Sequence, residues 1–275
     1  MDSTRMPRFE AMTTGALLDR AFRLYTSNFA LLLGITAVAY VPLYALMLLI
    51  QSSLTGGISV TASLSALFAQ VVFIILWASI ALPISTGAAT YAISERYLGN
   101  PVHSVDALRR SLKSLWTMSI AQLSAGARVM IGFILLIVPG ILWSLSYALI
   151  IPAVMVEGLK AGPSLKRSAE LAKGHRGKVF AIMVVINLLV VLLSSGVGSI
   201  AKLVLSLEST AGAIFGSAID SLVTILLTPL GIVANILLYY DLRIRKEGFD
   251  LEMLSRSFGT NTNTNASAPA LAPNS

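Results

Sequence analysis

Long apolar stretches alternate with short polar segments along most of this chain. No charged residue occurs between Leu24 and Ser94, and a helix that crosses a bilayer needs about 20 apolar residues. This stretch therefore has room for two spans, separated by the turn-forming residues 51–59. The pattern predicts transmembrane helices at 29–50 and 67–93.

Further apolar segments follow, separated by polar connections that are rich in basic residues. Pro139 and Gly140 interrupt one long apolar stretch and predict a tight turn between two spans. The C-terminal half then predicts one span on each side of a short polar connection. The expected fold is an all-α, polytopic bundle of six transmembrane helices, the last four at 116–138, 141–156, 179–200 and within 213–240.

The distribution of basic residues predicts how the bundle is oriented. All lysines and arginines except Arg128 and Lys202 fall on one side of the six-span arrangement. Because basic residues collect on the cytoplasmic side of membrane proteins, we expect both termini to lie in the cytoplasm. An odd number of spans would scatter these charges over both sides, so the asymmetry also favours six.

Composition is consistent with a chain surrounded by lipid. Of the 275 residues 56% are hydrophobic and 12% are charged, whereas soluble domains contain about 25% charged residues. The net charge of +7 is spread between the apolar spans, so we expect no nucleic-acid partner. The chain has no cysteine, which excludes disulfides, thiolate metal sites and a cysteine nucleophile.

A basic amphipathic segment precedes the first, third and fifth spans. Apolar residues recur at helical spacing in each segment, and Pro163 and Gly174 suit the two ends of the third. The chain is thus interpreted as three repeats of an interfacial helix plus a helical hairpin. Their basic faces are expected to contact anionic phospholipid headgroups; the alternative is a docking surface for a membrane or cytoplasmic protein. The interfacial helices are predicted near 14–27, 103–115 and 163–173.

The two ends of the chain differ in character from the rest. Residues 1–12 form the expected N-terminal cytoplasmic segment, and residues 13–258 form the membrane domain. After Phe258 the sequence is dominated by asparagine, threonine, alanine and proline. It has too little apolar area to pack, so a disordered tail is predicted at 259–275.

Little in the sequence indicates catalysis. Both histidines, His103 and His175, lie in cytoplasmic connections, and Asp220 is the only acidic residue well inside an apolar span. Intramembrane acid chemistry usually needs paired carboxylates, and no phosphate-binding loop or nucleophile elbow is present. We therefore expect no enzymatic activity, no cofactor and no metal.

The candidate polar site centres on Arg128, which lies within the third span, where a charge costs roughly 3 kcal/mol or more. At 1.5 Å per residue Arg128 is about 16–18 Å deep and Asn187 about 12 Å deep from the cytoplasmic side. Asp220 is about 30 Å deep. We therefore predict a hydrogen bond from Arg128 to Asn187 rather than a pair with Asp220. Kinks at Pro83 and Pro229 complete the candidate site.

Three stretches resemble the bacterial glycerophosphoryl diester phosphodiesterase membrane-domain family. The similarity covers roughly residues 14–254, and its most specific part is the C-terminal stretch. The resemblance implies a multi-pass protein of the bacterial cytoplasmic (inner) membrane. It does not imply phosphodiesterase activity, because in fused relatives catalysis belongs to a separate soluble barrel. The stretches are Val138-Pro-Gly-Ile, Glu157-Gly-Leu with Ser164 to Gly174, and Leu238 to Leu254.

Two functions are compatible with these patterns. The first is a non-catalytic scaffold or accessory membrane protein. The second is a small transporter or channel, with a polar site around Arg128 and the kinked second and sixth spans. A dry, fully packed bundle would favour the scaffold, whereas a polar cavity beside the proline kinks would favour transport.

Overall fold

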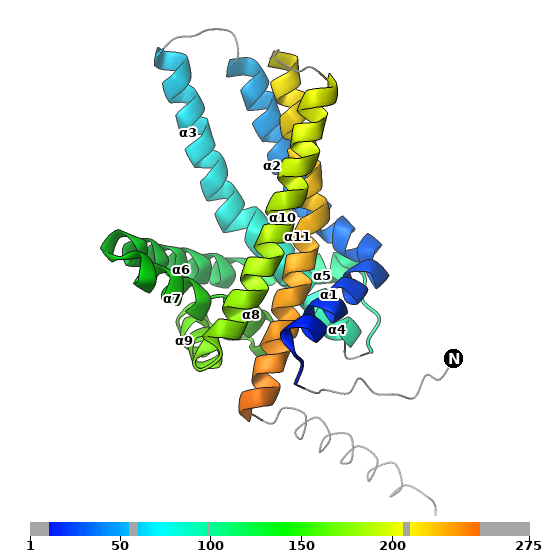
Figure 1. Ribbon diagram of the computed structural model, residues 1–275, viewed down its shortest axis with the longest axis vertical. Coiled ribbons are helices and arrows are strands. Elements are labelled where there is room, and N and C mark those ends of the chain that lie inside the picture. The colour runs from blue at the N-terminus through cyan, green and yellow to red at the C-terminus, as the bar shows by residue number, and fades with distance from the viewer. Residues whose placement is uncertain (1–10, 55–59, 98, 206–209, 248–275) are drawn as a thin grey trace, which may run out of the picture.

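The computed structural model describes residues 11–54, 60–97, 99–205 and 210–247, and every regular element in these ranges is helical (Figure 1). The predicted all-α class is confirmed. The tail predicted at 259–275 and most of the N-terminal segment lie outside the described residues. Within the described part, six segments are long and apolar enough to cross a membrane: Phe29–Ile50, Leu64–Tyr97, Leu115–Leu135, Ile137–Glu157, Arg176–Leu193 and Ala218–Glu247.

The N-terminal helices follow the predicted boundaries closely. Thr13 caps the first helix, since its hydroxyl oxygen accepts a hydrogen bond from the Ala16 amide at 3.3 Å. That helix ends at Asn28, and the first apolar span begins at the next residue. The two elements are α1 (Thr14–Ser27) and α2 (Phe29–Leu54).

The sequence predicts the second apolar segment as a single span, but in the structure this segment is not one regular helix. A short π-helical segment interrupts it, and Pro83 is the second residue of the helix that follows. Proline is tolerated there because the first turn of a helix needs no amide donors. The Ser119 hydroxyl satisfies the carbonyl of Ser79, which Pro83 leaves unpaired, at 2.5 Å. The elements are α3 (Val60–Leu76), η1 (Trp77–Ala81) and α4 (Leu82–Tyr97).

In the middle of the chain, the structure differs from the sequence prediction in the position of one turn and in the continuity of one span. The turn lies at Leu136, where the backbone is extended, and Pro139 and Gly140 stand in the first turn of the next helix. Proline starts this helix for the reason given for Pro83. The predicted span at 141–156 is broken at residues 147–149, and Pro152 lies in the first turn of its second piece. The elements are α5 (Ser104–Lys113), α6 (Leu115–Leu135), α7 (Ile137–Ser146) and α8 (Ile150–Glu157).

The last three helices include the longest in the molecule as described. Pro163 lies in the first turn of α9 (Ala161–Ala172), and Gly174 adopts a left-handed conformation just after it, with φ of 86°. Both positions agree with the prediction. The remaining elements are α10 (Arg176–Leu205) and α11 (Thr210–Glu247), which has 38 residues and contains Pro229.

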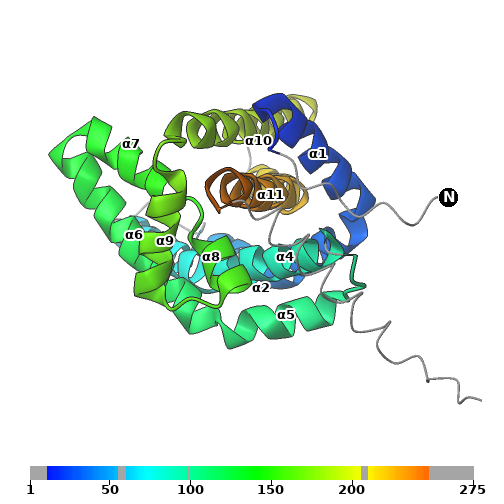
Figure 2. The same ribbon diagram turned by 90° about the horizontal axis from the view of Figure 1, so that it is seen from below.

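The described helices form two regions that differ in burial. In the inner region, helices α1, α4, α8, α9 and the basic ends of α10 and α11 enclose the main apolar core. Helix α11 lies at its centre when the molecule is seen from below (Figure 2). In the outer region, α3 and the far halves of α10 and α11 expose apolar side chains such as Phe68, Val191 and Phe215. Such surfaces suit lipid rather than water.

Candidate functional site: a neutral polar cavity

A cavity of about 520 Å³ lies between the helices where the two regions meet. This volume falls in the range of about 300–1,000 Å³ that is typical of small-molecule sites. Residues of α2, η1, α4, α6, α8, α10, α11 and the break between α7 and α8 line it. The lining residues that can form hydrogen bonds through their side chains are Tyr40, Trp77, Thr86, Thr90, Gln122, Tyr147, Asn187, Thr224, Thr228 and Asn235.

The chemistry of the lining is polar but uncharged. Among the described residues that line the cavity there is no Asp, Glu, Lys, Arg or His. Four buried side-chain atoms of the lining have no hydrogen-bond partner among the described residues: Tyr40 Oη, Trp77 Nε1, Gln122 Oε1 and Asn235 Oδ1. Leaving such groups unpaired costs about 1–3 kcal/mol each. The lining therefore holds one hydroxyl, one further donor and two acceptors that form no hydrogen bond within the described protein.

Two irregular backbone segments border the cavity. The first is η1, which contributes Trp77. The second is the break at residues 147–149, where the Ala148 carbonyl accepts a hydrogen bond from Asn235 Nδ2 at 2.9 Å. Ser168 holds the same break, because its hydroxyl donates to the Ser146 carbonyl at 2.7 Å and accepts from the Leu149 amide at 3.0 Å. π-Helical turns and broken membrane helices recur at functional sites.

Only part of the site predicted from sequence is found together. Asn187 lines the cavity, and its side-chain amide donates to the Met183 carbonyl at 2.8 Å. Pro83 and Pro229 are each adjacent in sequence to a lining residue. The cavity therefore lies beside both prolines.

Arg128 and Asp220 lie outside this cavity. The Arg128 guanidinium carbon is 5.9 Å from the centre of the Tyr147 ring, and no hydrogen bond joins it to Asn187 among the described residues. The reason is geometric, because α6 runs crosswise to α10 instead of beside it (Figure 1). Asp220 is exposed on α11, and its backbone carbonyl accepts from the Thr224 hydroxyl at 2.8 Å.

The sequence reasoning missed Gln122, Asn235 and Trp77. The signal was present, since Gln122 and Asn235 are amide side chains within apolar spans. Uncharged polar residues in a span must also find partners. The predicted site was centred on a charged residue, Arg128, and therefore did not include them.

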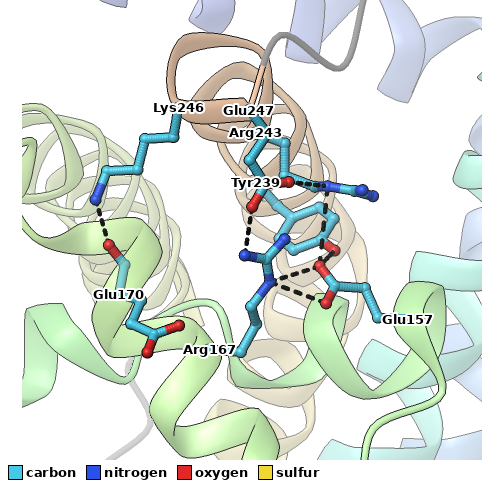
Figure 3. Close-up of polar contacts among 7 residues, drawn as sticks. All are labelled: Glu157, Arg167, Glu170, Tyr239, Arg243, Lys246 and Glu247. Atoms are coloured by element: carbon cyan, nitrogen blue, oxygen red, sulfur yellow. Dashed lines mark hydrogen bonds and ion pairs between the residues drawn. The ribbon is translucent and has the colours of Figure 1, made fainter. Parts of the chain in front are cut away.

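An ion-pair cluster joins α8, α9 and α11 on the basic side of the cavity (Figure 3). Arg167 Nε lies 2.9 Å from both carboxylate oxygens of Glu157, and its guanidinium also pairs with Glu247. The Tyr239 hydroxyl donates to Glu157. Arg243 Nε lies 3.1 Å from Glu247. The hydrogen bond to Glu247, more than the bonds to Glu157, raises the pKa of Arg167 above its usual value, against the effect of burial. The Arg167 guanidinium therefore stays charged within the cluster.

A second cluster joins α10 and α11 to the segment before α1. The fully buried Asp241 carboxylate lies 2.6 Å from Lys178 Nζ and 3.0 Å from Arg245 Nε. It also accepts a hydrogen bond from the Met12 amide at 2.7 Å. The Met12 carbonyl in turn accepts from Lys178 Nζ at 2.5 Å and from Arg245 at 2.7 Å. Buried charges paired in this way resist separation.

Comparison with known proteins gives no further guide to the site: no family model, curated protein or solved structure matches this chain. The resemblance to the phosphodiesterase membrane-domain family therefore stays a prediction from the sequence.

Proposed function

We propose that this protein is a small transporter of the bacterial inner membrane, which binds an uncharged, hydrogen-bonding solute in the central cavity. One observation carries the proposal. The cavity combines a small-molecule volume with unpaired donor and acceptor groups from Trp77, Gln122 and Asn235. A bundle that served only as a scaffold would have no use for buried polar groups without partners, because each destabilises the fold.

The lining selects the class of solute. An ion would have to leave water for a site without a counter-charge, at a large cost in free energy. A polyol, a sugar or an amide carries hydroxyl or amide groups that pair with the free atoms. Apolar lining residues such as Ile151, Ile186 and Ile232 would contact the carbon skeleton of such a molecule.

The ion-pair clusters suggest how one end of the cavity is closed. The cavity lining includes Leu238 on α11 and Ile182 on α10. About one helical turn from these residues, toward the basic side, lies the ion pair of Asp241 with Lys178. Passage of a solute to that side requires these helices to separate there. Both clusters join α11 to its neighbours, so α11 is the element that would move relative to them.

The proposed topology keeps both termini in the cytoplasm and arranges the chain as three units of a short helix and a hairpin. A contact that recurs between each short helix and a neighbouring unit supports this arrangement. Helix α5 packs against α4, α9 packs against α8, and α1 packs against α11. Each short helix thus contacts the last helix of the preceding unit, with the first unit contacting the third. All three units contribute to the cavity lining.

A non-catalytic scaffold is the second candidate, and the two ion-pair clusters favour it. They fix α8, α9, α10 and α11 in one arrangement on the basic side, as expected of a rigid docking platform. Neither candidate assigns an enzymatic reaction or a cofactor to the protein.

Binding of neutral solutes to the purified protein tests the choice between these functions. We expect glucose, xylitol or acetamide to raise the thermal unfolding temperature, and gluconate, an anion close to glucose in size, to leave it unchanged. Gln122→Leu and Asn235→Leu should abolish the shift, because they remove the free acceptors. Gln70→Leu is the matched control, since Gln70 is exposed on α3 away from the cavity.

Two results would reject the transporter. One is the absence of any shift with a broad panel of neutral polyols, sugars and amides. The other is a shift that survives in both Gln122→Leu and Asn235→Leu. A shift confined to the parent protein and Gln70→Leu should be followed by uptake of the same solute into proteoliposomes.

A further inference from the structure

The part of the α6–α7 hairpin that projects from the protein is too short to cross a membrane. Residues from Met118 to Ala125 on α6 include buried positions that pack within the protein, so only the second half of α6 projects with α7. Helix α7 has 10 residues, about 15 Å at 1.5 Å per residue. The hydrocarbon core is about 30 Å thick. Helix α8, which would have to complete the span, is buried inside the protein instead.

The direction of the hairpin also indicates that it does not cross the membrane. Helices α6 and α7 run crosswise to α10 and α11 in Figure 1, and from below they extend sideways from α11, which is seen end-on (Figure 2). Helix α11, with 38 residues, is about 57 Å long, and thus more than long enough to cross the bilayer upright. If α10 and α11 cross the membrane, the hairpin lies along its surface.

The tip of the hairpin is apolar and exposed. Ile134, Leu136 and Val138 are 77%, 69% and 66% exposed. The two helices approach closely at Gly132 and Gly140, where a Cβ on Gly132 would come within 2.9 Å of the Gly140 Cα. A closely packed hairpin with a bare apolar tip is stable only where the tip is removed from water.

Arg128 indicates the depth of the hairpin. It is exposed on α6 seven residues before Leu135, about 10 Å from the tip. Its contact in the structure is the Tyr147 ring, and no carboxylate pairs with it among the described residues. In a helix spanning the bilayer this charge would face acyl chains. In a hairpin lying in the surface layer it reaches the phosphate groups, where anionic lipid supplies the missing counter-charge.

We propose that the α6–α7 hairpin lies within the basic-side leaflet as an in-plane element, with its tip among the acyl chains and Arg128 bound to the phosphate of an anionic phospholipid. Four helical segments then cross the membrane: α2, α3 with η1, α10 and α11. Both ends of the hairpin remain on the basic side, so the charge asymmetry of the sequence is preserved. The inference rests on the proposed membrane topology and is independent of any solute in the cavity.

Single-cysteine labelling tests the position of the tip. The chain has no cysteine, so each introduced thiol is unique. With a membrane-impermeant maleimide, Thr210→Cys should react only from outside intact cells and Lys166→Cys only in inside-out vesicles. Leu136→Cys should not react from outside. A nitroxide attached to Leu136→Cys should lie within about 10 Å of the basic-side headgroups.

Labelling of Leu136→Cys from the outer side, or a nitroxide at the bilayer centre or beyond, would overturn the in-plane hairpin. Labelling of Thr210→Cys and Lys166→Cys from the same side would instead reject the proposed topology. Disulfide dimers of Leu136→Cys formed in preference to those of Val191→Cys, an exposed position on α10, would show that a second copy covers the tip. That result would also overturn the proposal.

Lipid quenching tests Arg128. The chain has three tryptophans, and in a Trp77→Phe background the two that remain, Trp116 and Trp143, lie on the hairpin. Brominated phosphatidylglycerol added to phosphatidylcholine nanodiscs should quench them. Arg128→Gln should raise the phosphatidylglycerol content needed for half-quenching about fivefold, as expected for one basic residue at an anionic surface. Lys166→Gln, outside the hairpin, should leave it unchanged. An unchanged midpoint in Arg128→Gln would refute lipid binding by this residue.

Discussion

The α6–α7 hairpin and the α10–α11 pair are both antiparallel, apolar and long enough by composition to suggest membrane spans. They nevertheless differ in direction and in the contacts that hold them together. Helices α10 and α11 are joined at their basic ends by the buried Lys178–Asp241 pair. Helices α6 and α7 are held by the close approach of Gly132 to Gly140. Similar apolar composition therefore does not give the two hairpins the same direction in the fold, and different contacts hold each of them together.

The largest effect is expected from Lys178→Met. This change leaves Asp241, which is fully buried, with Arg245 as its remaining cation. Removal of one partner from a buried ion pair costs about 3–5 kcal/mol. The free energy of unfolding, measured by titration with denaturing detergent in mixed micelles, should fall by about that amount.

The control for this prediction is Lys166→Met, because the Lys166 side chain is 82% exposed and its pair with Glu170 is 3.9 Å long. Exposed pairs contribute about 0–1 kcal/mol. Adding Asp241→Asn to Lys178→Met should recover part of the loss, because it removes the buried charge that only Arg245 would then compensate. A loss equal to that of Lys166→Met would show that the ion pair does not hold α10 and α11 together.

A smaller effect is expected from Gly132→Ala in the hairpin. The new methyl group would lie 2.9 Å from the Gly140 Cα and from the Trp143 ring. Backbone cannot yield locally, so α6 and α7 must separate, at a cost of about 1–3 kcal/mol. The same detergent titration should report this loss, and nitroxides on the two helices should report the larger separation.

Gly231→Ala provides the matched change in the α10–α11 pair. Its methyl group would lie 3.2 Å from the Ile186 Cγ2 methyl group, and a shift of a few tenths of an ångström in that side chain relieves the contact. Both glycines are inside helices, so both variants gain similarly in helix propensity. Equal losses in the two variants would contradict the view that close glycine contact is specific to the hairpin.

The smallest effect is expected from Ser119→Ala, which removes the hydroxyl that satisfies the Ser79 carbonyl. A hydrogen bond of this kind contributes about 1 kcal/mol, and here it joins the base of α6 to η1. We expect a loss of about 1 kcal/mol in unfolding free energy, together with greater angular freedom of a nitroxide-labelled hairpin. Ser144→Ala is the control, since that hydroxyl donates only within α7, to the Ile141 carbonyl. A Ser119→Ala protein as stable as Ser144→Ala would argue against this anchor.

Much of the candidate site could not be predicted from the sequence. Asn187 was predicted as a polar position of interest because its depth in the fifth span places it within reach of Arg128. Its partner was predicted wrongly, because the depth estimate assumed that α6 stands upright. Gln122 and Asn235 lie far apart in sequence, and only the fold brings both to the cavity lining. No local pattern specifies that distance.

The sequence by itself determined the helical class, the extent of most helices and the asymmetry of charge. These properties depend on local apolar runs, on proline and glycine at helix ends, and on the cost of placing charge in lipid. The direction of the hairpin, the break before α8, the cavity and both ion-pair clusters were decided only by the tertiary structure. They arise from contacts between residues distant in sequence, such as Met12 with Asp241 and Ser119 with Ser79, which no local pattern encodes.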